Sequence, residues 1–264
     1  MSRSAPTRRR PLVAGNWKMN LTHLEAIALV QKVAFSLTDQ QLAAVEVVVL
    51  PPYISLRSVQ TLVDGDKIEI GYGAQDLSPH AKGAYTGDIS GHMLAALRCS
   101  YVLVGHSERR EHHHEDDAVI NAKIRAARQF GLRPVLCVGE RLEVRRAGGQ
   151  IGHCVTQLDA GLAGMSAADL GEFAVAYEPI WAIGTGEVAT PEDAQEVCAE
   201  LRARLSQTYG PAVAGATRIL YGGSVKADNA EGIFAQPDVD GGLVGGASVQ
   251  AEDFAAICRA AAVD

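Results

Sequence analysis

Short apolar runs alternate along the chain with longer segments in which apolar positions recur at helical spacing. Runs of this length, rich in Val, Leu, Ile and Ala, are typical of strands buried in a parallel sheet. Eight such runs with helical segments between them predict a repeated strand–helix plan. We assign the strands to Leu12–Gly15, Val45–Leu50, Ile68–Ala74, Tyr101–Gly105, Pro134–Val138, Phe173–Tyr177, Arg218–Tyr221 and Gly242–Val244.

The segments between the runs carry the apolar stripe of amphipathic helices, as in Leu24–Leu37, Asp117–Phe130 and Pro191–Leu205. The last of these has a well-marked start. Thr190 is a preferred N-cap residue, Pro191 suits the first helical position, and acidic residues follow in the first turn.

The number of units decides the fold class. Eight strand–helix units in 264 residues favour one closed (β/α)8 TIM barrel, spanning residues 11–264. A doubly wound open sheet is the alternative, but the turn at Gly15–Lys18 lacks the glycine pattern of a dinucleotide-binding fold. Residues 1–10 are expected to form a flexible leader and not a targeting signal, because Arg8–Arg10 are not followed by the apolar h-region of a signal peptide.

Composition and charge exclude several functions. The net charge of −7 argues against binding nucleic acid or a membrane surface, which requires a basic face. No apolar run approaches the roughly 18 residues of a membrane span. The five cysteines form no Cys-x-x-Cys pair, a pattern typical of free thiols in a reducing cytoplasm. We therefore expect a cytoplasmic protein without nucleic-acid or membrane partners.

Catalytic side chains of (β/α)8 barrels come from the C-terminal ends of the strands. Asn16 and Lys18 alternate with Trp17 after the first strand, so they are expected to face one way while Trp17 packs the other way. The rule selects residues after strands one, four, six, seven and eight: Asn16, Lys18, His106, Ser107, Glu178, Tyr221–Ser224, Gly245 and Gly246.

Two glycine-rich turns on this rim point to a phosphate group. Gly222–Ser224 and Gly245–Gly246 can bring backbone N–H groups close to an oxyanion, because no Cβ blocks the approach. Ala247–Val249 is expected to begin a short helix whose N-terminus attracts an anion. Lys18 adds a cation that can neutralise the phosphate. Ordinary tight turns are the alternative interpretation of the glycine pairs.

Glu178 ends the sixth strand and precedes an apolar segment held between Pro179 and two glycines, Gly184 and Gly186. Such a segment is a candidate lid, and a carboxylate desolvated beneath it becomes more basic. The pattern predicts a general base that removes a proton from a carbon next to a carbonyl group. A salt bridge on the rim is the alternative role.

His106 precedes Ser107–Arg110, which is expected to start a helix. A His at a helix N-terminus is less basic, so its neutral ring can donate an N–H to a carbonyl oxygen. An ordinary helix cap is the alternative. His112–His114 predict no metal site, because three consecutive residues cannot share one helix face. We interpret them as a solvated first helical turn, and adventitious metal binding stays open.

Four motifs make the chain similar to the triosephosphate isomerase family. They run in order from about Pro11 to the C-terminus and comprise Gly15–Asn20, Val104–Arg110, Ala176–Gly186 and Tyr221–Val225. The resemblance implies the interconversion of dihydroxyacetone phosphate and D-glyceraldehyde 3-phosphate, in glycolysis and gluconeogenesis. It implies no organic cofactor and no metal.

The resemblance also implies a role for each candidate residue. Glu178 would be the base, and His106 would move protons at the two substrate oxygens. Lys18 and Asn16 would stabilise the enediolate-like charge, with Glu108 as a supporting acid. The substrate phosphate would lie among the backbone N–H groups of Gly184, Ser224, Gly245 and Gly246.

Members of this family are dimers, occasionally tetramers. The resemblance implies a homodimer through the loop Gln75–Asp88, with Thr86 at the tip that enters the neighbouring site. Cys137 is expected to pack near the base and not to act as a nucleophile. Glu187 departs from many relatives, which carry Lys at this position of the lid hinge.

Rival functions on the same scaffold are disfavoured by single features. A Schiff-base aldolase needs a Lys deep in a strand, and no apolar run has one at its centre. A metal-dependent epimerase needs several His and acidic ligands at the strand ends, where only His106 qualifies. A non-catalytic binding protein would not need the candidate base, electrophile and cation together, although an added binding role stays open.

Overall fold

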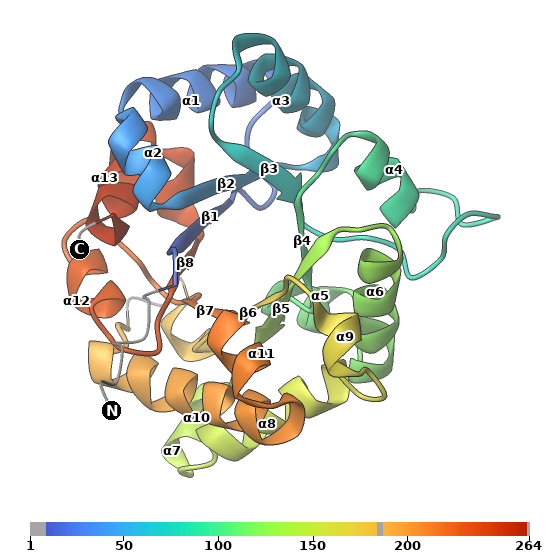
Figure 1. Ribbon diagram of the computed structural model, residues 1–264, viewed down its shortest axis with the longest axis vertical. Coiled ribbons are helices and arrows are strands. Elements are labelled where there is room, and N and C mark those ends of the chain that lie inside the picture. The colour runs from blue at the N-terminus through green and yellow to red at the C-terminus, as the bar shows by residue number, and fades with distance from the viewer. Residues whose placement is uncertain (1–8, 184–186, 263–264) are drawn as a thin grey trace, which may run out of the picture.

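Eight parallel strands form a closed barrel in the order of the chain, and β8 pairs with β1 to complete it (Figure 1). The computed structural model describes residues 9–183 and 187–262. It confirms the predicted (β/α)8 fold. The strands are β1 Leu12–Asn16, β2 Glu46–Leu50, β3 Gly71–Ala74, β4 Tyr101–Val104, β5 Arg133–Val138, β6 Ala174–Tyr177, β7 Arg218–Tyr221 and β8 Gly241–Val244.

Helices connect the strands and surround the barrel (Figure 1). The α-helices are α1 His23–Phe35, α2 Asp39–Ala44, α3 Tyr53–Asp66, α4 Gly91–Ala96, α5 Ser107–His112, α6 Asp117–Gln129, α7 Leu142–Arg146, α8 Gln150–Gly161, α9 Ala167–Leu170, α10 Pro191–Tyr209, α11 Pro211–Ala216, α12 Ala230–Phe234 and α13 Ala251–Ala261. Two 3₁₀-helices, η1 Ile180–Ala182 and η2 Gly246–Val249, follow β6 and β8.

The apolar run from Ile68 predicts a longer third strand than the one observed, because β3 begins only at Gly71. The preceding helix α3 ends at Asp66, and its C-cap residue Lys67 takes a left-handed conformation with φ 53°. The Ile68 N–H then donates back to the carbonyl oxygen of Val63. Residues 68–70 therefore belong to the helix end and its exit turn.

The start of α10 confirms the sequence prediction. The Thr190 hydroxyl accepts the Asp193 N–H, the Asp193 carboxylate accepts the Thr190 N–H, and Pro191 is the first helical residue. The helix continues beyond the predicted end at Leu205 as far as Tyr209. It stops there because Gly210 has a positive φ of 89° and Pro211 begins the next helix.

The core consists of two layers separated by the barrel wall. Side chains outside the barrel pack between the strands and the surrounding helices. Burial on both faces explains why the strands read as continuous apolar runs. Because the interior is filled, functional side chains have room only beyond the strand ends. The inner layer consists of Leu12, Ala14, Val48, Leu50, Tyr101, Leu103, Val135, Cys137, Ala174, Ala176, Leu220 and Leu243.

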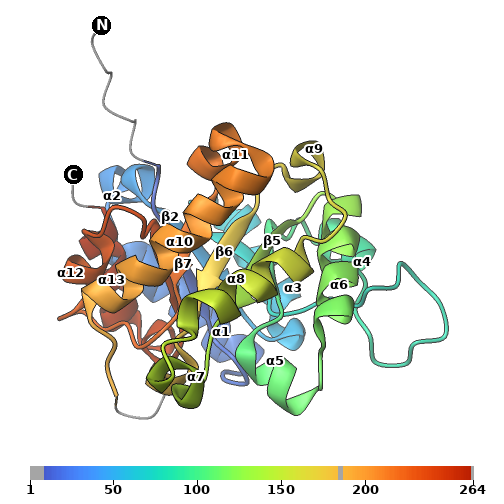
Figure 2. The same ribbon diagram turned by 90° about the horizontal axis from the view of Figure 1, so that it is seen from below.

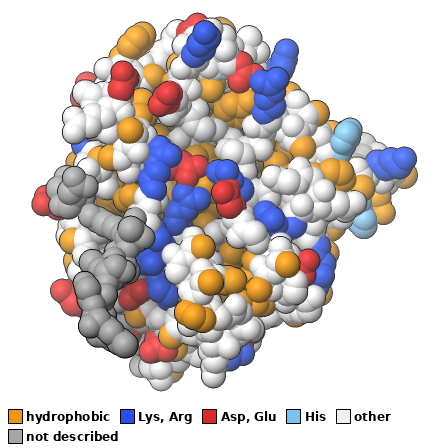
Figure 3. Space-filling view, in the orientation of Figure 1, with side chains coloured by type: hydrophobic (Ala, Val, Ile, Leu, Met, Phe, Trp, Pro, Cys, Tyr) orange, Lys and Arg blue, Asp and Glu red, His pale blue; other side chains and the backbone are white. Residues whose placement is uncertain are grey.

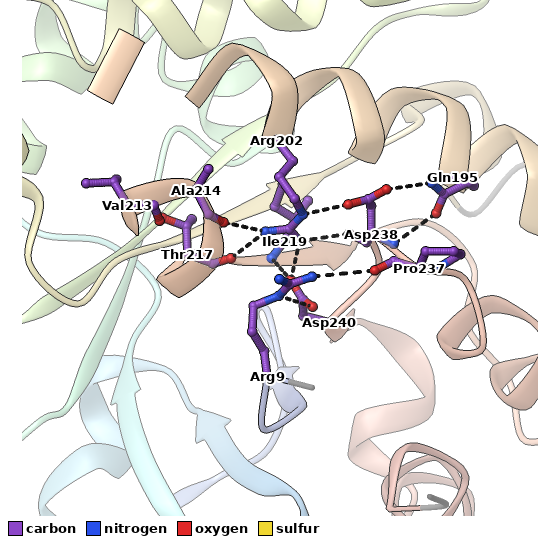
Figure 4. Close-up of polar contacts among 10 residues, drawn as sticks. All are labelled: Arg9, Gln195, Arg202, Val213, Ala214, Thr217, Ile219, Pro237, Asp238 and Asp240. Atoms are coloured by element: carbon purple, nitrogen blue, oxygen red, sulfur yellow. Dashed lines mark hydrogen bonds and ion pairs between the residues drawn. The ribbon is translucent and has the colours of Figure 1, made fainter. Parts of the chain in front are cut away.

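Arg9 and Arg10 are anchored to the barrel, although the sequence places them in a flexible leader. Arg9 Nε lies 2.6 Å from Asp240 Oδ1, and the Arg10 guanidinium donates to two main-chain carbonyl groups. Figure 4 shows Arg9 joining a network in which Arg202 pairs with both Asp238 and Asp240. Arg9 and Arg10 therefore contact the barrel, and the residues before Arg9 lie outside the described part.

The two ends of the barrel carry different segments. Figure 2 shows α5 and α7, which follow strands, at one end, and α11, which precedes β7, at the other. The end with α5 is formed by the C-terminal ends of the strands, where the candidate site residues lie. Among the described residues, no helix is long and apolar enough to cross a membrane.

Candidate active site

A pocket of about 650 Å³ lies at the C-terminal ends of the strands. Most of the residues selected from the sequence line this pocket. Ser107, Glu108 and Tyr221 do not line it, although Glu108 contacts the lining residues Lys18 and His106. Gly184 lies outside the described residues. The candidates that line the pocket are Asn16, Lys18, His106, Glu178, Gly222, Gly223, Ser224, Gly245 and Gly246.

Lys18 reaches the pocket through an unusual backbone turn and not through strand alternation. The strand β1 ends at Asn16, and Lys18 has a positive φ of 53°. Its N–H donates to the side-chain oxygen of Asn16 at 3.1 Å, while Trp17 is fully buried as predicted. Gln75 supports the turn, because its amide donates to the carbonyl oxygens of Lys18 at 2.9 Å and Leu50 at 2.8 Å.

Sequence reasoning assigns Gln75 only to the dimer loop and misses this supporting role. Its position directly after β3 follows the same strand-end rule that selects the other candidates. The structure thus adds a neutral amide that holds the main chain of a catalytic candidate in a costly left-handed conformation.

Lys18 and Glu108 form a charged pair beside the pocket. Lys18 Nζ lies 2.6 Å from Glu108 Oε1, and Glu108 Oε2 lies 3.7 Å from His106 Nδ1. The predicted nearness of these three residues is therefore confirmed. The pair fixes the ammonium group on the side of the pocket that faces His106.

Glu178 is almost completely buried, with 2% exposure, at the end of β6. One carboxylate oxygen lies 2.9 Å from His106 Nε2, and the other accepts the Ser107 N–H at 2.9 Å. Burial by itself raises the pKa of Glu178, but His106 and Ser107 outweigh burial and hold the pKa below its ordinary value. The predicted effect of burial is therefore present, but these two contacts outweigh it in this arrangement.

His106 is the N-cap residue of α5, as the sequence predicts. Its Nδ1 accepts the Glu108 N–H at 3.2 Å, so the proton of the neutral ring resides on Nε2, which lies 2.9 Å from Glu178 Oε1. Burial lowers the pKa of His106, but the Glu178 and Glu108 carboxylates together outweigh burial and raise the pKa above its usual value. The predicted decrease is not observed because a facing carboxylate acts more strongly than a six-residue helix.

The glycines around the pocket serve two purposes. A Cβ on Gly222 would lie 3.0 Å from Glu178 Cγ, and a Cβ on Gly139 would lie 1.8 Å from the Glu178 carbonyl oxygen. These glycines allow the base to fit. A Cβ on Gly246 would meet no atom within 4 Å, and one on Gly245 would meet only the end of Lys18. The backbone of the last two glycines is therefore open to a ligand.

A buried acid supports the segment after the base. Trp181 in η1 donates its indole N–H to Glu140 Oε1 at 2.8 Å, and the Tyr177 hydroxyl donates to the same oxygen at 3.0 Å. Glu140 follows β5 and is fully buried. Glu140 is not among the residues selected from the sequence, although the strand-end rule applied to β5 would have included it.

Comparison with known proteins identifies the family. The family model described as triosephosphate isomerase matches residues 11–261. The chain belongs to the triosephosphate isomerase family. It is 60% identical over 253 residues to the triosephosphate isomerase of Streptomyces avermitilis, covering 96% of this chain and 98% of that protein. The triosephosphate isomerases of Mycobacterium tuberculosis and Saccharopolyspora erythraea are each 59% identical over 254 residues, with 96% and 97% coverage.

Two other expectations concern residues beside this triosephosphate isomerase site. His112–His114 end the short helix α5 and do not form a first turn, since His113 is its C-cap and His114 has φ 54°. Among the described residues, no three His, Cys, Asp or Glu side chains are grouped to hold a metal ion. Cys137 is fully buried, and burial together with nearby Glu178 raises the pKa of its thiol. Its packing role is confirmed.

Proposed function

We propose that this protein interconverts dihydroxyacetone phosphate and D-glyceraldehyde 3-phosphate through an enediolate intermediate. The position of Glu178 carries the proposal: a buried carboxylate 2.9 Å from His106 Nε2, in one pocket with Lys18. Glu178 takes a proton from one substrate carbon and returns it to the neighbouring carbon. His106 donates its Nε2 proton to the carbonyl oxygen and recovers a proton from the other oxygen. Lys18 and Asn16 stabilise the negative charge between these steps.

The proposed reaction requires Glu178 to exchange partners. When the Glu178 carboxylate turns to a substrate carbon, it gives up its contacts with Ser107 and His106. These are the two contacts that lower the pKa of Glu178. Burial then remains the main influence and makes the carboxylate a stronger base. When Glu178 leaves its contact with His106, the main influence that raises the pKa of His106 is removed. The ring is then neutral, with Nδ1 accepting the Glu108 N–H and the proton on Nε2 available for donation.

The substrate phosphate is proposed to lie against the backbone of Ser224, Gly245 and Gly246, with Gly184 completing the group when the lid closes. Support comes from the open approach to Gly245 and Gly246 and from η2, which begins there. Closure of the Ile180–Gly186 segment would exclude water and prevent elimination of phosphate from the intermediate. Residues 184–186 lie outside the described residues.

The rival reactions find less support. None of the eight strands contains a Lys, which a Schiff-base aldolase would need inside the barrel. The described residues hold no cluster of metal ligands for an epimerase. Proton transfer by Glu178 and His106 needs neither a lysine inside the barrel nor a metal ion.

We also propose that the protein acts in the cytoplasm, in glycolysis and gluconeogenesis, as a homodimer through the loop Gln75–Asp88. Residues 80–88 are exposed, and the loop between β3 and α4 extends away from the barrel in Figures 1 and 2. Stacking of His80 on Tyr85, with ring centroids 3.8 Å apart, stiffens the loop near its Thr86 tip. A stiff exposed loop loses little conformational entropy when it docks on a second copy.

A coupled assay with D-glyceraldehyde 3-phosphate, with sedimentation on the same sample, tests both proposals. We expect turnover without any added cofactor, unchanged after exhaustive chelation. We also expect a sedimenting mass of twice 27.9 kDa. Absence of turnover would refute the reaction, and loss on chelation would refute the metal-free mechanism. A 27.9 kDa species would refute the dimer.

A further inference from the structure

A second charged pocket lies at the opposite end of the barrel, where the strands begin. Figure 3 shows Lys and Arg side chains gathered around the centre of this face, interspersed with acidic ones. The pocket measures about 470 Å³. Four of its lining residues are arginines and two are glutamates, in a chain whose net charge is −7. It is lined by Arg9, Arg10, Glu46, Arg133, Glu172, Phe173, Ala216 and Arg218.

Glu46 is committed to the barrel and not to a ligand. It pairs with both Arg218 and Arg133, and it accepts a hydrogen bond from the Tyr101 hydroxyl at 3.0 Å. The guanidinium groups of Arg133 and Arg218 also lie 5.4 and 5.8 Å from the centre of the Tyr101 ring. This cluster forms a rigid polar floor in which the arginines keep fixed positions.

Arg10 is the uncompensated cation of the pocket. Its guanidinium donates to the carbonyl oxygens of Leu42 at 2.7 Å and Val45 at 3.2 Å. These neutral groups orient the side chain but do not cancel its charge. Among the described residues, Arg10 forms no ion pair, whereas Arg9 is neutralised by Asp240.

Glu172 is the replaceable member of the pocket. Its side chain is 64% exposed, and its ion pair within the described residues is with Arg133 alone. An ion pair exposed to this degree contributes little, because water solvates both charges well when they part. An incoming anion can therefore displace the Glu172 carboxylate from Arg133, which Glu46 continues to hold in place.

We propose that this pocket binds a small soluble phosphoryl anion, gripped by Arg10 and Arg133, with Phe173 and Ala216 as an apolar wall. The planar guanidinium of arginine presents paired N–H groups that match phosphate oxygens. The site is separate from the phosphate position of the proposed reaction, because the two lie at opposite ends of the filled barrel.

Binding of inorganic pyrophosphate, measured by calorimetry, tests the site. 2-Phosphoglycolate is held at the lowest concentration that fills the catalytic pocket. The titration is repeated at twice that concentration, because 2-phosphoglycolate is itself a phosphoryl anion and would compete for the second site. We expect one additional site with a dissociation constant in the millimolar range or below. Arg10→Gln should weaken binding at least fivefold, whereas Glu172→Gln should strengthen it about threefold because it removes the competing carboxylate. A role of Glu172 in stability alone does not produce this increase in affinity.

Two matched variants make the same charge changes elsewhere. Arg98 is 77% exposed and Glu111 is 48% exposed, and neither lines the pocket. Arg98→Gln and Glu111→Gln should leave pyrophosphate binding unchanged. If Arg98→Gln and Arg10→Gln weakened pyrophosphate binding equally, the effect would come from net charge alone and the proposal would be overturned. The absence of an additional binding site would also overturn it. Failure of the proposed reaction would not affect the comparison, since none of these residues lines the catalytic pocket.

Discussion

At the scale of single residues, the central feature of the site is the contact between Glu178 and His106. Their 2.9 Å contact opposes the effect of burial on both groups, lowering the pKa of one and raising that of the other. The contact therefore keeps the Glu178 carboxylate ionised. A base must be ionised before it can accept a proton, so this arrangement prepares Glu178 for the proposed reaction.

Shortening the base by one methylene group tests its role. Glu178→Asp should leave the fold intact and reduce kcat roughly 100-fold or more, because the carboxylate retreats from the substrate carbon by about 1 Å. Steady-state kinetics with circular dichroism measure the two effects. Glu143→Asp, on the exposed surface of α7, is the matched control. Near-normal turnover of the purified Glu178→Asp protein would remove Glu178 as the base.

The coupled pair also predicts a pH dependence of stability. Because the folded-state pKa of His106 is raised, its contribution is complete below about pH 6.5 and is lost as pH rises through the folded pKa. The lowered pKa of Glu178 gives a contribution present above about pH 4.5 and lost as pH falls through the folded pKa. Replacement of His106 should therefore cost most stability between these limits.

Melting temperatures of the wild type and His106→Gln, measured at pH 5.5 and pH 9, test this expectation. The difference should be larger at pH 5.5, since the substituted amide does not titrate. His23→Gln, at an exposed position, should show no such trend. An equal difference at both pH values would contradict the assignment of the raised pKa to the Glu178 contact.

At the scale of elements, β5 and β6 approach so closely beyond their ends that only glycine fits at position 139. A Cβ there would lie 1.8 Å from the Glu178 carbonyl oxygen and 3.1 Å from its Cβ. The Glu178 N–H is also bound to the carbonyl oxygen of Val138 at 2.7 Å. The position of the base is therefore set by the neighbouring strand.

Gly139→Ala should displace the backbone of Glu178, reduce kcat at least tenfold and lower stability by about 2 kcal/mol or more. Gly152→Ala is its matched control, because that residue lies inside α8 and an added Cβ would meet no atom within 4 Å. The control should retain activity and gain about 0.5–1 kcal/mol, as alanine favours a helix. Urea denaturation and kinetics measure both. Unaltered activity of Gly139→Ala would show that β5 does not position the base.

At the scale of the whole molecule, the filled barrel separates two charged pockets at its two ends. The pocket at the strand C-termini combines Lys18 with open glycine backbone. The pocket at the N-termini consists of arginines held by acids, aromatic rings and carbonyl groups. Ligand binding at either end should stabilise the same folded barrel, because its strands form one closed sheet.

Binding of 2-phosphoglycolate at 100 times its dissociation constant should add about 2.7 kcal/mol of stability. For a barrel of this size this corresponds to a rise in melting temperature of roughly 5–10 °C. Gly246→Asp is expected to abolish the shift. Its side chain has space, but its carboxylate would repel the phosphate. An unchanged melting curve of the wild type at saturating ligand would contradict the phosphate site.

The sequence by itself determines the strand–helix repeat, the barrel and most of the rim residues, because strands buried on both faces read as apolar runs and functional residues must follow them. The start of α10 is equally local, since Thr190 and Asp193 cap it within one turn.

Only the tertiary structure decides what these residues experience. The pKa directions of Glu178 and His106 come from a contact across 72 positions of sequence, 106 to 178, and the left-handed turn of Lys18 is supported by Gln75 from another strand end. The anchoring of Arg9 likewise depends on Asp240 at the far end of the chain. Charge effects act through space, so their sign depends on which strand ends the closed barrel brings together.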